Sequence, residues 1–398
     1  MLRCLVCSQS DALPLLTVAR VPLLGCVFAE SPSEARLAEC GPIELVLCPE
    51  CTHIYNRAFQ PERVGYAPGY ENALGFSAHY CAYLSATAER LIHTYELRSK
   101  SIVEIGCGSA DLLSLLCSQG GNHGIGYDPS QQSRAFPIGE GSIEVRSQSF
   151  TTTDLAPVDF VCSKHVLEHL EELQTTLRRA RSVLKQEGAG YFEVPNGLSI
   201  LHDCRIWDLT YEHVSYFSPL SLQRALSDAG FSVVHIENSF GGQYLYAEVL
   251  TDKGTSIAPP MVDAGANISG DFAVTFGAML ERWKGTIAAM IAEGRRVVLW
   301  GAGVKAVGFL NMLDIGANEG VEYVVDINPK KTGRFMPGTA QKIVSPEYLR
   351  DYRPDVVVVM NPEYLGEIQS TLESEGVDCD LLVASSALAG AKSPTIVI

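Results

Sequence analysis

The chain has 398 residues and a formal net charge of −16, and no basic stripe offsets its acidic excess. This length exceeds a single typical core, so we expect two or three domains. The charge argues against nucleic acid or an anionic membrane as a partner, and no apolar run approaches the roughly 20 residues that span a bilayer. Because the amino terminus also lacks a signal sequence, we expect a cytoplasmic protein, either a monomer or a small homo-oligomer.

The first segment, residues 1–75, contains two Cys-x-x-Cys pairs. They supply four thiols: Cys4, Cys7, Cys48 and Cys51. Each such turn presents two sulfurs to one side of a metal ion, and four thiolates complete a tetrahedral zinc site with no open position. A segment this short buries little core, so we expect the zinc to be structural. A redox pair or unligated thiols are the alternative, and Cys26 and Cys40 are interpreted as packing residues.

The second segment, residues 76–252, opens with an apolar strand that ends in a glycine turn. Residues 102–105 precede Gly106-Cys107-Gly108, and a helical pattern follows, which is how a parallel strand passes to its helix across a nucleotide. Twenty residues after Gly108, a second apolar run ends at Asp128, whose carboxylate can accept hydrogen bonds from both ribose hydroxyls. These features predict an adenosine site.

The form of the glycine turn separates two adenosine cofactors. A dinucleotide has a pyrophosphate that a full G-x-G-x-x-G wraps, whereas this turn is shorter and follows an acid inside the strand. The pattern resembles class I S-adenosylmethionine-dependent methyltransferases, and a generic doubly wound domain is the alternative. We therefore predict S-adenosylmethionine as the cofactor. Its expected contacts are Glu104, Gly106, Gly108 and Asp128.

Polar residues follow the next predicted strands of this segment. Residues 158–162 are predicted as a strand, 164–185 as a helix and 188–194 as the next strand. The carboxyl ends of parallel strands share one edge of a sheet, so their polar residues should meet at the mouth of the cofactor crevice. Those residues are Ser163, Lys164, His165 and Asn196. We expect the first three to bind the cofactor, with His165 near its methionine end, and Asn196 to bind the substrate.

A loop after Asn196 is dense in ionisable and aromatic side chains, which is typical of catalytic loops. It runs from Trp207 to Phe217 and contains the sequence Tyr211-Glu212-His213. A neutral histidine is a fitting general base, and an adjacent carboxylate can orient it. Tyr216 and Phe217 are interpreted as core residues.

The third segment, residues 253–398, repeats the pattern of a strand and a glycine turn. It begins with a linker near residues 253–270 and a predicted helix over 271–293, and the strands are predicted at residues 296–300, 323–326 and 355–360. The turn Gly301-Ala302-Gly303 leads to Lys305 at a helix amino terminus, where a cation adds to the amide dipoles that bind phosphate. We predict that Gly301, Gly303 and Lys305 bind an anionic substrate group. A degenerate Rossmann domain that only packs is the alternative.

These features, taken in chain order, resemble the nucleotide-sugar C-methyltransferases of deoxysugar and antibiotic biosynthesis. The resemblance rests on Cys4/Cys7/Cys48/Cys51, Glu104 to Gly108, Val166-Leu167-Glu168-His169, Glu212-His213, Gly301 to Lys305 and Pro337-Gly338-Thr339. It implies an α/β fold, with a class I methyltransferase doubly wound sheet. A small N-terminal zinc-binding domain and a C-terminal Rossmann-like substrate-binding domain would flank this sheet.

The resemblance also implies a reaction. A 4-keto nucleotide sugar would lie between the middle and last domains, and His213, paired with Glu212, would remove the proton alpha to the ketone. The resulting enolate needs a hydrogen-bond donor at its oxygen, and the candidates are Tyr211, Tyr70 and His169. The sugar enzymes have a tyrosine where this chain has Thr210, so the donor and the particular sugar are left open. The alternatives are an O- or N-methyltransferase of another small metabolite and a scaffold with a vestigial cofactor site.

Overall fold

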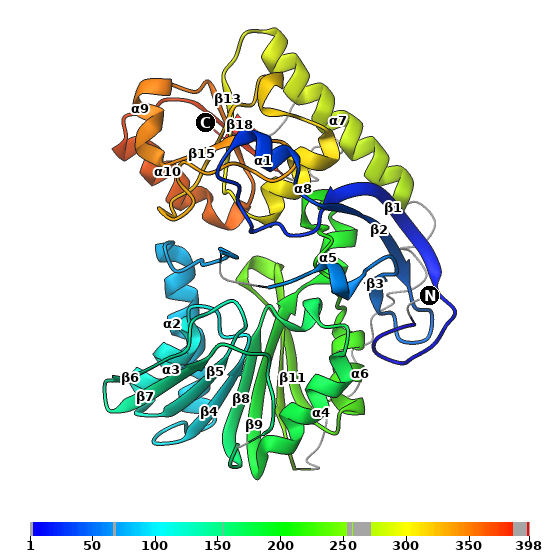
Figure 1. Cartoon of the computed structure of the whole chain (residues 1–398), viewed down its shortest axis with the longest axis vertical. Coiled ribbons are helices and arrows are strands. Elements are labelled where there is room, and N and C mark those ends of the chain that lie inside the picture. Colours follow the sequence, from blue (N-terminus) through cyan, green and yellow to red (C-terminus); the bar gives the residue numbers. More distant parts are fainter. Residues whose placement is uncertain are drawn as a thin grey trace.

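The computed structural model describes residues 3–66, 69–153, 155–252, 257, 272–384 and 396–397. Three β-sheets organise these residues. Figure 1 shows the middle sheet below, the third sheet with its helices above, and the strands of the first sheet along one side. The linker predicted at residues 253–270 lies outside the described residues, apart from residue 257.

The first sheet is antiparallel and takes its fourth strand from the middle segment. Its strand order is β1-β2-β3-β10. The strands are β1 (Leu13–Pro22), β2 (Cys40–Leu47), β3 (Ile54–Asn56) and β10 (Ser215–Tyr216), and the connections contain α1 (Pro32–Arg36) and the 3-10 turn η1 (Pro61–Arg63). Ser215 pairs with Tyr55, and Tyr216 pairs with Ile54. The predicted catalytic loop is therefore hydrogen-bonded to the N-terminal strands.

The second sheet has eight strands in the order β11-β12-β9-β8-β4-β5-β7-β6. They are β4 (Ser101–Ile105), β5 (His123–Tyr127), β6 (Arg134–Ile138), β7 (Gly141–Arg146), β8 (Val158–Lys164), β9 (Leu184–Pro195), β11 (Ser232–Ser239) and β12 (Tyr244–Leu250). Five neighbouring strands of the sheet, β9-β8-β4-β5-β7, are parallel. The outer strands β6, β12 and β11 pair antiparallel with their neighbours. Because the chain passes from β4 to β5 on one side and later to β8 on the other, a ligand crevice opens at the carboxyl end of β4.

Helices and turns connect these strands. They are α2 (Ala78–Thr94), α3 (Asp111–Gly120), η2 (Leu167–His169), α4 (Leu173–Val183), α5 (Gly197–His202), η3 (Ile206–Asp208), α6 (Pro219–Asp228) and η4 (Phe240–Gly242). The predicted helix over residues 164–185 is wrong at both ends. Lys164 still belongs to β8, where it pairs with Glu193 of β9, and His165 then adopts a φ of 54°, which a right-handed helix excludes. The chain completes turn η2 before α4 begins, and α4 ends one residue before β9 begins.

The third sheet has the order β15-β14-β13-β16-β17-β18 and is parallel except for β18. Its strands are β13 (Val297–Trp300), β14 (Tyr323–Val325), β15 (Lys342–Val344), β16 (Val356–Val359), β17 (Asp380–Val383) and β18 (Ile396–Val397). Its helices and turns are α7 (Phe272–Ala292), α8 (Val304–Leu313), η5 (Ala317–Glu319), η6 (Pro346–Tyr348), α9 (Leu349–Tyr352), η7 (Pro362–Tyr364) and α10 (Leu365–Ser374). All four valines of β16 are buried, as expected for a parallel sheet covered on both faces. No helix in the described part of the chain is long and apolar enough to cross a membrane.

An aromatic cluster joins the third sheet to the middle segment. Trp207 from η3, Trp283 from α7 and Phe309 from α8 are buried, with ring centroids 5.2 to 6.4 Å apart. Gly308 approaches this loop so closely that a Cβ atom would lie 3.0 Å from the Trp207 carbonyl oxygen. This packing holds the amino end of α8, where the second glycine turn lies, against the loop after β9.

Candidate active site

A cavity of about 700 Å³ opens between the carboxyl edge of the second sheet and the glycine turn of the third. All three segments line it, including Tyr70 from the first, Asp128 from the second and Lys305 from the third. A volume of this size is typical of sites for small molecules and cofactors. The cavity is thus the place where the predicted cofactor and substrate residues can meet.

The first glycine turn lies on the cavity wall and needs its glycines for different reasons. Gly106 has a φ of 68°, and a Cβ atom there would lie 2.1 Å from the Val166 side chain. Gly108 has a φ of 50° and nothing within 4 Å of where a Cβ atom would be, so its backbone is open to a ligand. The amide of Gly108 donates to Asp128 Oδ2 at 2.8 Å. The carboxylate predicted to hold ribose therefore also holds the turn.

Glu104 supplies a buried acceptor beneath this turn. Its side chain lies on β4 and is 3% exposed, and Oε2 has no hydrogen-bond partner within the described residues. Burial raises the pKa of Glu104 to about 8. A buried polar atom without a partner, on the wall of a cavity, fits a donor group carried by a bound ligand.

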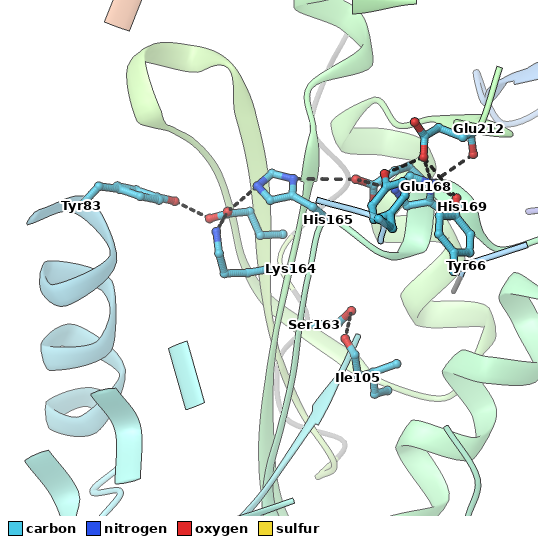
Figure 2. Close-up of polar contacts among 11 residues, drawn as sticks. Tyr66, Tyr83, Ile105, Ser163, Lys164, His165, Glu168, His169 and Glu212 are labelled. Atoms are coloured by element: carbon cyan, nitrogen blue, oxygen red, sulfur yellow. Dashed lines mark hydrogen bonds and ion pairs between the residues drawn. The ribbon is translucent and has the colours of Figure 1, made fainter. Parts of the chain in front are cut away.

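The end of β8 carries a charged network around Glu193, which is fully buried. Lys164 Nζ and the Tyr83 hydroxyl both bind the Glu193 carboxylate, and His165 Nε2 lies 3.2 Å from Glu193 Oε1 (Figure 2). Lys164 and His165 line the cavity, whereas Ser163 is fully buried and donates to the Ile105 carbonyl at 3.1 Å. Ser163 was expected to bind the cofactor, but in the structure it joins β8 to β4.

A cluster of histidines forms the next part of the wall. The ring centroids of His169 and His213 lie 4.8 Å apart, and both residues line the cavity together with Glu168. His169 Nδ1 lies 2.7 Å from the Tyr66 hydroxyl (Figure 2). The Nδ1 atom of His213 has no hydrogen-bond partner among the described residues. Burial and the nearby His169 lower the pKa of His213 to about 3, so its imidazole is neutral at physiological pH.

The hydrogen bonds of the Glu212 carboxylate go to residues other than His213, although the two residues are adjacent in sequence. Glu212 is fully buried, and its Oε1 accepts from the Gly25 amide at 2.9 Å while its Oε2 accepts from the Tyr70 hydroxyl at 2.6 Å. Burial and the Glu212 charge raise the pKa of Tyr70 well above its usual value, so its phenol stays protonated. Glu212 thereby connects the catalytic loop to the N-terminal segment.

Besides Ser163 and Glu212, two more predicted site residues lie away from the cavity. Tyr211 is fully buried, packs on Phe59 and accepts a hydrogen bond from the Gln60 amide at 3.0 Å, so its phenol is a core group and not a proton donor to substrate. Asn196 caps helix α5 by accepting from the Ser199 amide at 3.3 Å. Neither residue lines the cavity, and this corrects the expectation that they contact ligands.

The second glycine turn and two cations form the opposite wall. The cavity is lined here by Gly301, Gly303 and Lys305, the three residues that were predicted to bind an anionic substrate group. Lys305 forms an ion pair with Asp208, and Arg205 Nε lies 3.1 Å from Asp208 Oδ2. Two cations thus share one carboxylate beside the turn.

Three residues of the wall were absent from the sequence-based candidates. Arg205 lies three residues before Asp208, a spacing that favours ion pairs on a turn. Glu168 was noted only as part of a motif with His169. Tyr66 had no local signal, because only the folded chain brings it to His169.

The four N-terminal cysteines form a separate cluster near the first sheet. The Sγ atoms of Cys4 and Cys51 are 3.5 Å apart, those of Cys7 and Cys48 are 3.4 Å apart, and all four lie within 4.8 Å of one another. All four are free thiols. Four sulfurs about 3.8 Å apart are what a tetrahedral zinc ion with bonds of about 2.3 Å requires. The donor set therefore fits zinc.

Comparisons with known proteins match both large domains. Residues 77–236 match the family model described as "Methyltransferase domain", and residues 267–377 match "C-methyltransferase C-terminal domain". The C-methyltransferase NovU of Streptomyces niveus is 22% identical over 92% of this chain and 90% of NovU.

Similar solved structures include two methyltransferases. The 1,6-didemethyltoxoflavin-N1-methyltransferase of Burkholderia thailandensis is 16% identical, with a TM-score of 0.34, over 52% of this chain and 98% of its own. The magnesium protoporphyrin IX methyltransferase of Synechocystis PCC 6803 is 16% identical, with a TM-score of 0.34, over 48% of this chain and 90% of its own. At TM-scores this low, neither similarity is evidence for the fold or the activity of this chain.

The strand order, the glycine turn and the matched middle domain define an S-adenosylmethionine-dependent methyltransferase. More specifically, with the matched C-terminal domain and NovU as a relative over nearly its whole length, the protein is a C-methyltransferase. The residues present fit the cofactor: Gly108 leaves open space, Asp128 offers a carboxylate, and Glu104 has an unpaired buried oxygen.

Replacing Asp128 with asparagine should weaken S-adenosylmethionine binding about 10- to 100-fold. The substitution removes a charged acceptor, and hydrogen bonds to charged groups contribute about 1.5 to 3 kcal/mol. Isothermal titration calorimetry measures the effect. Glu140→Gln, an exposed carboxylate in the same domain, is the matched control and should bind normally. An unchanged dissociation constant in a folded Asp128→Asn protein would show that the cofactor lies elsewhere.

Proposed function

We propose that the protein methylates a carbon alpha to a ketone, and that the substrate is a nucleotide-linked keto-deoxysugar. The observation that carries this proposal is the position of His213. Its imidazole lines the same cavity as the cofactor turn at Gly106 and Gly108, and one of its nitrogens is without a partner among the described residues. A side chain of this kind can remove a proton from a substrate carbon next to the cofactor.

In this proposal the chain's residues create the carbon nucleophile. S-adenosylmethionine supplies an electrophilic methyl group when it is bound. His213 accepts the alpha proton, the electrons of the broken C–H bond become the enolate, and the enolate carbon is then the nucleophile. The cavity also has Tyr70 and His169 on its wall, and we propose His169 as the donor toward the enolate oxygen, because the Tyr70 hydroxyl already donates to Glu212. Tyr211 is no longer a candidate, because its hydroxyl is engaged in the core.

Two cations beside the second glycine turn support an anionic substrate. Lys305 and Arg205 outnumber their shared partner Asp208, and the turn from Gly301 to Gly303 lies at the amino end of α8, where backbone amides favour phosphate. Arg205 adds a planar group suited to a diphosphate. Because the chain as a whole is strongly acidic, a local cationic site is what an anionic ligand would need.

Replacing His213 with glutamine should lower turnover by about 10²- to 10⁴-fold, the usual contribution of a general base, and leave S-adenosylmethionine binding intact. With a nucleoside-diphosphate 4-keto-6-deoxyhexose as probe, the variant should also stop exchanging the alpha proton in deuterated water. His93→Gln, an exposed histidine at the end of α2, is the control. Wild-type turnover in the variant would refute the role of His213. A product methylated on oxygen or nitrogen would favour the heteroatom alternative.

Replacing Lys305 with methionine should raise the KM for the same probe about tenfold or more, because a charged contact to phosphate is lost. The dissociation constant of S-adenosylmethionine should not change. Steady-state kinetics and calorimetry distinguish the two effects, and Lys284→Met on α7, an exposed lysine, is the control. If KM stays at its wild-type value, the third sheet serves only as a packing partner.

We also propose a structural zinc ion at Cys4, Cys7, Cys48 and Cys51. In this view residues 1–75 form a zinc-binding domain, residues 76–252 the cofactor domain and residues 253–398 the substrate domain. The fit of the four sulfurs supports the metal. A set of four protein ligands, with no fifth among the described residues, supports a structural role.

Elemental analysis of purified protein should find one equivalent of zinc. Cys48→Ser should lose the metal and unfold at a lower temperature, because a structural zinc ion stabilises the fold that binds it. Cys81→Ser, an exposed thiol outside the cluster, should keep both the metal and the unfolding temperature. A metal-free wild-type protein with full stability would contradict the assignment.

A further inference from the structure

Two buried carboxylates lie near His213, and their hydrogen bonding differs. Glu212 is engaged on both oxygens, by the Gly25 amide and the Tyr70 hydroxyl. Glu168 is 1% exposed, and neither of its oxygens has a hydrogen-bond partner within the described residues. A buried carboxylate without hydrogen bonds is costly unless an opposite charge lies close to it. Glu168 is therefore placed to interact with positively charged side chains and not with backbone amides.

Imidazole rings surround this carboxylate. Glu168 Oε1 lies 3.7 Å from His165 Nδ1 and 4.0 Å from His169 Nε2, and Figure 2 draws the contact with His165 beside His169. One oxygen of Glu168 and one ring nitrogen each of His169 and His213 all lie within 4.8 Å of one another. The Tyr216 ring, whose centroid is 6.0 Å from that of His213, is a further neighbour.

The environment of His213 opposes a positive charge. Burial is the largest cause of its lowered pKa, and His169, His165 and Lys305 add to it, whereas Glu168 acts in the opposite direction. Burial alone would raise the pKa of Glu168, but the neighbouring histidines hold it below its usual range, so the carboxylate is ionised. When His213 accepts a proton, an imidazolium forms in this environment. A carboxylate within 4.8 Å lowers the cost of that charge.

We propose that Glu168, and not the adjacent Glu212, is the positioning residue that orients His213 and balances its charge during proton removal. The inference rests on the proposed role of His213 as the base. In the step itself, the C–H electron pair stays on the substrate as the enolate, the proton forms an N–H bond on His213, and Glu168 remains a carboxylate. Glu212 has a different role, which is to fasten Tyr66 and Tyr70 of the N-terminal segment to the catalytic loop.

Two isosteric variants separate these roles. With the nucleoside-diphosphate 4-keto-6-deoxyhexose as probe, Glu168→Gln should lower kcat and the rate of alpha-proton exchange by about 10²-fold and leave KM within about threefold of wild type. Glu168→Asp keeps the charge, so its kcat and its exchange rate should be at least about tenfold higher than those of Glu168→Gln. Glu212→Gln should instead raise KM, because it loosens the tyrosines that line the cavity.

A spectroscopic measurement tests the same contact without substrate. In protein labelled with ¹⁵N-histidine, and with resonances assigned through single histidine variants, the signals of His165 and His213 should shift in Glu168→Gln and stay in place in Glu212→Gln. If Glu168→Gln does not fold, Glu168→Asp is compared with wild type in both measurements, and it should show smaller changes of the same sign.

Several results would overturn the inference. They are a kcat of Glu168→Gln within threefold of wild type, a loss confined to KM, histidine signals that do not respond to Glu168, or a second equivalent of bound metal that disappears in Glu168→Gln. Failure of the proposed function is a separate result: wild-type protein would methylate its substrate without exchanging or losing an alpha proton. The ¹⁵N signals would still report whether Glu168 contacts His213.

Discussion

The pairing of β10 with β3 is the constraint on which the candidate site depends. Two residues of the middle segment, Ser215 and Tyr216, complete the N-terminal sheet, so the loop just before them is held between that sheet and the middle segment. That loop carries Glu212 and His213. In this position, Glu212 accepts a hydrogen bond from the amide of Gly25, which belongs to the N-terminal segment. The N-terminal segment therefore shapes the catalytic wall, and is more than an addition to the methyltransferase sheet.

Some of the charges around the cavity form buried ion pairs within the protein. Lys164 with Glu193 and Lys331 with Asp326 are buried pairs, in which Lys331 Nζ also donates to the Ala302 carbonyl at 2.7 Å. Such pairs add little net stability, but they hold side chains in defined places. The acid at the end of β14 is thus engaged within the protein. By contrast, oxygens of Glu104 and Glu168 have no hydrogen-bond partner among the described residues. These oxygens are available to a bound ligand or to a positive charge that forms during the reaction.

The sequence patterns that predict the cofactor site and those that predict the strand ends differ in how many residues they depend on. The strand, glycine turn and spaced acid that predict the cofactor act within some 25 residues, and the structure has Gly106, Gly108 and Asp128 on one wall. The end of β8 could not be placed in the same way. Lys164 is the first residue of the helix predicted over residues 164–185, but pairing with β9 keeps it extended, and cross-strand hydrogen bonds outweigh a weak local preference.

The sequence by itself determined the chemistry of the parts: a glycine turn with its acid, two cysteine pairs, a loop rich in histidine and glutamate, and a second glycine turn with a lysine. Only the tertiary structure decided which of these side chains face the cavity. Tyr211 and Glu212 are neighbours in sequence, but they turn to the core and to the N-terminal segment. Tyr66 lies beside His169, and Glu168 beside His213, although each pair is far apart in the sequence. The reason is physical, because the direction of a side chain in a loop is set by what packs against it, and those contacts come from residues far away in the chain.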